Sequence, residues 1–110
     1  MGIEHQLHRT SVDISKGYRQ IEKSATLMAK GDSDRAIKHL TTALNDFGSA
    51  IDHAAKAEDD AATKAGSELD KGNTQLQKAI TSYSDGHPDA AQGHYDSAVE
   101  AYSNAIDLLD

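Results

Sequence analysis

The chain has 110 residues, a formal net charge of −7 at pH 7 and no cysteine, a size that suits a single domain. One proline, one phenylalanine and no tryptophan, beside 17 alanines, leave little of the aromatic material that sheets need, which excludes an all-β fold. The lack of cysteine excludes disulfides, thiolate metal sites and covalently attached haem. No apolar run approaches the roughly 18 residues that cross a bilayer, so membrane insertion is not expected.

Two helices are predicted in the first half of the chain, because apolar and small residues recur there at alternating spacings of four and three. Between them, Gly31 followed by Asp32 and Asp34 predicts a helix end and a new N-cap. The two stripes consist of Leu7, Ser11, Ile14, Tyr18, Ile21, Ala25 and Met28, and of Ala36, Leu40, Ala43, Phe47, Ala50 and Ala54.

The second half predicts two more helices, separated by Gly86 and by Pro88, which suits a first helical turn. A loop at 58–60, where there is neither glycine nor proline, is inferred from the likeness of the two halves of the chain and from an aspartate suited to an N-cap. One helix continuous over 34–84 is the alternative. The stripes are Ala62, Ala65, Leu69, Gly72, Leu76, Ala79 and Tyr83, and Ala91, Tyr95, Ala98, Tyr102, Ala105 and Leu109.

The two halves also resemble each other. Residues 13–52 match residues 68–107 without a gap, with thirteen identities at a shift of 55. A register kept over this length indicates one supersecondary unit used twice. We therefore predict an all-α fold, an up-down-up-down four-helix bundle made of two duplicated helical hairpins, about 1–55 and about 56–110.

Charge is distributed unevenly. Residues 1–55 carry seven basic and seven acidic side chains, whereas residues 56–110 carry four and eleven. This acidic balance argues against nucleic acid as a partner. The acidic second half either keeps a small bundle soluble, attracts cations or faces a basic protein partner.

Six histidines are the candidate functional residues. The hairpin topology places His39, His87 and His94 toward the end of the bundle with the two glycine–aspartate turns, and His5, His8 and His53 toward the other end. At the amino terminus, helical spacing puts Glu4 and His8 on one face with His5 beside them. Imidazole and carboxylate groups at that spacing are suited to Cu(II), Ni(II) or Zn(II), although exposed histidines on a frayed helix end would look the same.

His39 and His94 occupy equivalent positions beside the core stripes. His39, Asp46 and His53 share a heptad position, but successive members are about two turns apart, too far for one mononuclear site. They form either a solvated helix edge or separate weak ligand positions. At the second turn, Asp85, His87 and Asp89 form a local group suited to a divalent ion or to helix capping.

Three segments, 31–43, 51–57 and 86–100, resemble the small metal-binding protein family, whose histidine-rich, periplasmic helical hairpins repeat a Gly-His and Ala-x-x-His pattern. The resemblance implies binding of divalent metals, copper and nickel among them, at helix-surface histidines, and an extracytoplasmic location; the residues themselves leave a cytoplasmic one open. The positions that match are His39, His53, His87 and His94. Fewer ligands than in the family are expected, because Asp32, Asp46 and Leu108 stand where further histidines would fall.

No enzyme activity and no nucleotide cofactor are predicted, because a catalytic triad, a di-iron Glu-x-x-His pattern and a phosphate-binding glycine loop are all missing from the sequence. The leading hypothesis is a small divalent-metal-binding or metal-buffering protein. The alternative is a non-catalytic interaction bundle whose acidic face binds a partner. Histidine phosphotransfer through His39 ranks third, since Thr42 and Ala43 stand where such domains carry a Lys-Gly pair.

Overall fold

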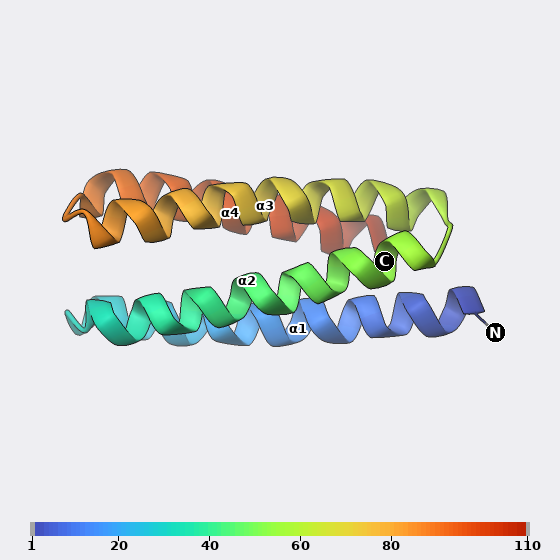
Figure 1. The fold of residues 1–110 in the computed structure, drawn as a ribbon, viewed down its shortest axis with the longest axis horizontal. Coiled ribbons are helices and arrows are strands. Elements are labelled where there is room, and N and C mark those ends of the chain that lie inside the picture. The colour runs from blue at the N-terminus through green and yellow to red at the C-terminus, as the bar shows by residue number, and fades with distance from the viewer. Residues whose placement is uncertain (1, 110) are drawn as a thin grey trace.

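A computed structural model describes the backbone of residues 2–109 and the side chains of residues 6–109. It contains four helices and, over that range, no β-strand: α1 (Gly2–Ala29), α2 (Ser33–Lys56), α3 (Asp60–Ser84) and α4 (Pro88–Leu109). They run up and down in a rod of about 46 × 18 × 18 Å. Helix α1 pairs with α2 and α3 with α4 (Figure 1). The predicted all-α four-helix bundle is confirmed.

The turns within the two hairpins have the same construction. Gly31 and Gly86 have φ angles of 80° and 81°, the left-handed region that glycine adopts without a steric penalty. At both turns the residue after the glycine donates its N–H to the carbonyl five residues earlier, at 2.9 and 2.8 Å, which is a Schellman motif. The Asp32 side chain then caps α2, and Pro88 opens α4 as predicted. Both turns therefore lie at one end of the bundle, opposite the α2–α3 connection (Figure 1).

The predicted loop between the hairpins is also present. Helix α2 ends at Lys56 and α3 begins at Asp60, so a continuous helix over 34–84 is excluded. The Asp59 carboxylate accepts a hydrogen bond from the Ala62 N–H at 3.1 Å, as an N-cap does. Glu58 reverses the chain with a φ of 52°, which costs a non-glycine residue some backbone strain.

The predicted core stripe is confirmed in full for α2 and in its first six positions for α3, while Tyr83, Tyr95 and Leu109 are only partly buried. For α1 the stripe is confirmed at Ile14 and Ile21, which are buried, while Ser11 and Ala25 are exposed. Thr10, Gly17 and Ser24 complete the buried face instead. Thr10 and Ser24 are tolerated inside because each hydroxyl donates to a carbonyl of its own helix, at 2.7 and 2.6 Å.

Two stacked aromatic rings occupy the centre of the core. The Phe47 and Tyr102 rings lie 3.6 Å apart between centroids, at an angle of 15°. Each ring lies against a glycine of the facing helix in its own hairpin: a Cβ added to Gly17 would come within 2.6 Å of the Phe47 ring, and one added to Gly72 would collide with Tyr102. The two contacts are related by the 55-residue shift, so they join equivalent levels of the two hairpins.

The two seams between the hairpins differ. Helix α2 packs against α3 much more extensively than α1 packs against α4. Tyr18 and Tyr95 span the α1–α4 seam: the Tyr18 hydroxyl meets Ser103 Oγ at 2.7 Å, and the Tyr95 hydroxyl donates to the Ile21 carbonyl at 3.4 Å. The corresponding positions after the 55-residue shift are the smaller Asn73 and Leu40. The larger side chains of Tyr18 and Tyr95 therefore hold α1 and α4 farther apart than α2 and α3.

Replacing Gly17 with alanine should destabilise the fold although alanine favours helices. Its methyl group would overlap the Phe47 ring, and overpacking of this kind typically costs about 1–3 kcal/mol. Gly48→Ala is the matched control, because a Cβ there meets nothing within 4 Å, and it should raise the free energy of unfolding by about 1 kcal/mol. Urea denaturation followed by circular dichroism measures both; stabilisation by Gly17→Ala would contradict the close contact.

Candidate metal site

Two histidine–glutamine pairs recur at equivalent positions of the hairpins. His39 Nδ1 lies 2.6 Å from Gln20 Oε1, and His94 Nδ1 lies 2.9 Å from Gln75 Oε1. Each pair joins the second helix of its hairpin to the first. Both histidines are half-buried at the edge of the core, where the sequence placed them.

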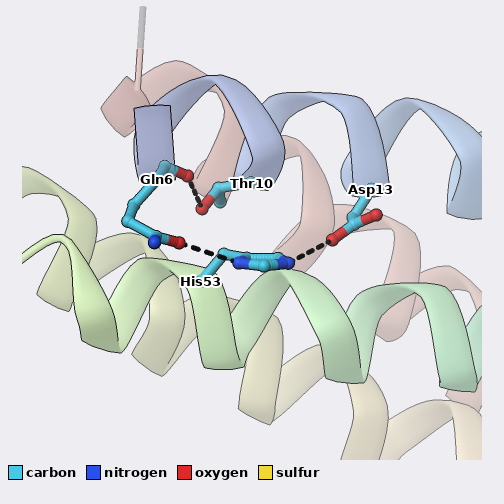
Figure 2. Close-up of polar contacts among 4 residues, drawn as sticks. All are labelled: Gln6, Thr10, Asp13 and His53. Atoms are coloured by element: carbon cyan, nitrogen blue, oxygen red, sulfur yellow. Dashed lines mark hydrogen bonds and ion pairs between the residues drawn. The ribbon is translucent and has the colours of Figure 1, made fainter. Parts of the chain in front are cut away.

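A third pair of the same kind lies at the opposite end of the first hairpin. His53 Nδ1 is 2.8 Å from Gln6 Oε1 (Figure 2). The Thr10 hydroxyl donates to the Gln6 carbonyl, which ties this turn of α1 together. The pairs Gln6–His53 and Gln20–His39 are 14 residues apart on each helix, about four turns, so they lie along one edge of the antiparallel hairpin.

These contacts favour one proton position on each imidazole. An amide oxygen can only accept a hydrogen bond, so each contact is a hydrogen bond when Nδ1 carries the proton. In the neutral ring this leaves Nε2 with a free lone pair. Fixing the tautomer through the other ring nitrogen is what the outer shell of a histidine metal site does.

The ring of His53 differs from the other two in what its Nε2 faces. It lies 3.6 Å from Asp13 Oδ2, and Figure 2 shows the imidazole between Gln6 on one side and Asp13 on the other. The two side chains are only 20% and 16% exposed. Asp13 Oδ2 is buried and accepts no hydrogen bond from any described protein group.

A second carboxylate lies near this pair. The pKa of Asp46 is raised above its ordinary value of 3.8, first by burial and then by the negative charge of Asp13, while Lys16 acts in the opposite direction. Asp46 lies on the α2 edge midway between His39 and His53, and Asp13 lies midway between Gln20 and Gln6 on α1. This edge therefore carries two carboxylates and one imidazole, although the three do not converge on one position.

The second hairpin keeps only the first part of this arrangement. Gln75 and His94 reproduce the pair at the turn end, but the remaining positions are occupied by Ala61, Glu68, Ala101 and Leu108. Glu68 pairs instead with Lys71 at 3.8 Å. His94 lines a shallow groove of about 400 Å³ that also contains Lys78, whose charge opposes a cation there.

The other predicted ligands are spread out. His8 and His87 are exposed, and α4 begins directly after His87. The side chains of Glu4 and His5 lie outside the described part of the chain. Among the side chains of residues 6–109, no group of three or more histidine, aspartate or glutamate residues converges on a metal position, so the turn residues Asp85, His87 and Asp89 do not form a ready-made site.

Sequence reasoning missed Asp13 and the three glutamines. The available signal was the hairpin register: once the turn is fixed at Gly31, Gln6, Asp13 and Gln20 fall opposite His53, Asp46 and His39. Because polar residues on an outer edge tolerate many pairings, the heptad pattern alone did not select these partners.

Comparison of the chain with family models, with curated proteins and with solved structures finds no match. Within the described residues, no helix combines the length and apolar character needed to cross a membrane.

The three glutamine contacts predict one tautomer for three rings. In long-range ¹H–¹⁵N spectra above pH 8, where imidazoles are neutral, His39, His53 and His94 should each show a protonated Nδ1 and an unprotonated Nε2. Exposed His87 is the internal reference, because free imidazole favours a proton on Nε2. A proton on Nε2 in the three rings would contradict the contacts.

Asp46→Asn should stabilise the protein at neutral pH. A carboxylate with a raised pKa is penalised in the folded state above that pKa, and the penalty disappears below the unfolded value of 3.8, where both states are protonated. The melting temperature should therefore rise at pH 7, and its difference from the parent should shrink toward about pH 3. Asp52→Asn on the exposed side of α2 removes the same charge; an equal rise in both variants would mean that net charge alone is responsible.

Proposed function

We propose that the protein binds divalent transition-metal ions, Cu(II), Ni(II) or Zn(II), at histidines on the hairpin edges and acts as a small metal buffer. The observation that carries this proposal is the repeated tie from histidine Nδ1 to a glutamine oxygen, found at His39, His53 and His94. It presents a lone pair at Nε2 on three separate rings. Neutral imidazole is a preferred ligand of these ions.

Two further features support a cation as the ligand. The net charge is −7, and α4 carries Asp89, Asp96, Glu100 and Asp107 without a lysine or arginine, so the surface concentrates cations. The segments 31–57 and 86–108 resemble small metal-binding proteins, and the three tied histidines fall within them.

His39 and His94 each supply one ligand from the protein. Water or a second molecule then completes the coordination, which gives an open site and a modest affinity. Open sites that exchange their metal suit a buffer better than a structural metal centre. Among the described residues, the buried core holds no histidine, aspartate or glutamate, so its packing does not depend on the ion.

Calorimetric titration with Cu(II), Ni(II) and Zn(II) tests the proposal. His39→Ala and His94→Ala should each remove part of the uptake while helix content stays nearly unchanged, because both rings lie outside the core. Uptake should also fall below about pH 6.5, where the imidazole is protonated and its lone pair is lost.

Gln20→Leu and Gln75→Leu are the matched variants, since they keep both histidines and remove only the tie. They should weaken binding by about 10–100-fold at the neighbouring ring. A double His39→Ala, His94→Ala variant with the parent's uptake would reject both positions, and no binding heat in the parent would reject the function.

The acidic surface of α4 supports a second candidate, a non-catalytic module that binds a basic protein partner. This function requires no histidine. Salt-sensitive binding of a lysine-rich peptide that survives loss of all six histidines, together with no metal uptake by the parent, would favour it.

A further inference from the structure

We propose that Asp13 and His53 form the preferred metal site of this chain, with one ion held between α1 and α2 by Asp13 Oδ2 and His53 Nε2. The inference rests on the proposed function and deepens it, because it assigns the strongest position to a two-ligand site that neither helix supplies alone. Gln6 holds the imidazole, and water fills the remaining coordination positions.

The separation of the two atoms supports a metal ion rather than a proton between them. A charge-assisted N–H···O bond spans about 2.7–2.9 Å, and the observed Nε2–Oδ2 distance is 3.6 Å. Ligand atoms lie about 2.0–2.2 Å from Zn(II), so two of them at a tetrahedral angle are about 3.3–3.5 Å apart. The gap is too wide for a hydrogen bond and close to the span of a metal ion.

The chemistry of the two atoms leads to the same conclusion. The tie to Gln6 directs an Nε2 lone pair toward the carboxylate, so in the neutral ring two electron-rich atoms face each other. Asp13 Oδ2 is buried and has no described hydrogen-bond donor, which is costly for a carboxylate oxygen. A divalent cation would satisfy both atoms at once.

Charges of both signs surround the pair and do not form a closed cage. Asp46 adds a second carboxylate, which is close enough to Asp13 for the two negative charges to repel each other. Lys16 and Arg9 line a groove beside Asp13, but among the described side chains only His53 comes within ion-pair distance of Asp13. One nitrogen and one carboxylate oxygen form a borderline set that suits Zn(II), Ni(II) or Cu(II) rather than Ca(II).

The site belongs to the first hairpin alone. Asp13 becomes Glu68 after the 55-residue shift, while His53 becomes Leu108 and Gln6 becomes Ala61. The second hairpin therefore provides a built-in comparison: it has a carboxylate at the same level but no imidazole opposite.

Zn(II) titration of the full chain, followed through the ¹H–¹³C signals of the histidine rings, tests the inference. The His53 signals should shift first and saturate at one equivalent, before those of His39 and His94. Asp13→Asn should weaken Zn(II) binding at His53 at least about tenfold. This variant is expected to fold, because it removes a poorly satisfied buried carboxylate, and its helix content is checked by circular dichroism.

Glu68→Gln is the matched control, since it removes the same charge at the equivalent level of the other hairpin and should leave binding at His53 nearly unchanged. His53→Gln removes the α2 ligand independently and should abolish the first binding step. Equal affinity at His53 in Asp13→Asn and the parent, or simultaneous titration of all three rings in the parent, would overturn the inference. If His39 and His94 respond to Zn(II) and His53 does not, only this inference fails; if no ring responds, the proposed function fails as well.

Discussion

The stack of Phe47 on Tyr102 is the contact on which the rest of the bundle depends. It joins the two hairpins at their centre, where each ring lies directly against a glycine of the neighbouring helix. Most of the other buried hydrophobic residues are alanines, which bury little apolar area each, so these two rings supply a large share of the hydrophobic contribution to stability. Burial, with a smaller effect from Tyr18, raises the pKa of the Tyr102 hydroxyl far above its ordinary range, so the hydroxyl stays protonated. It donates a hydrogen bond to Asn73 Oδ1 at 2.7 Å.

The glycine contacts also explain why histidine–glutamine pairs can form along the hairpin edges. Because α1 and α2 approach closely at Gly17, long polar side chains at the margin of their interface reach across to the other helix. Gln20 meets His39 above this level and Gln6 meets His53 below it. In the second hairpin Gly72 allows the same approach, and Gln75 meets His94. Close packing in the core thus sets the spacing of the polar pairs outside it.

The fold could be read from the sequence to a large extent, because helix ends have strong local signals. Glycine at the two turns, Pro88 and the aspartate caps fix where the chain reverses, and the alanine stripes identify the inward face. The α1 stripe is right at Ile14 and Ile21 but wrong at Ser11 and Ala25, because the buried face runs instead through Gly17 and the hydroxyl residues Thr10 and Ser24. A glycine under a ring or a threonine bonded to its own helix gives no hydrophobic signal. The candidate site was only half visible: the histidines could be named, but the carboxylate opposite His53 depends on the register between two helices.

The position of Asp13 is physically reasonable only because it lies at an edge. A carboxylate without a hydrogen-bond donor would be untenable in the fully buried core, and in full solvent it would need no partner. Its side chain is 16% exposed while Oδ2 itself is buried, so this oxygen is poorly solvated although the residue lies near the surface. The equivalent Glu68 has a longer side chain and pairs with Lys71, so the carboxylate of the second hairpin has a partner. Among the described residues, the two hairpins therefore differ in one respect that matters for binding: only the first sets an imidazole nitrogen 3.6 Å from a carboxylate oxygen that has no hydrogen-bond donor.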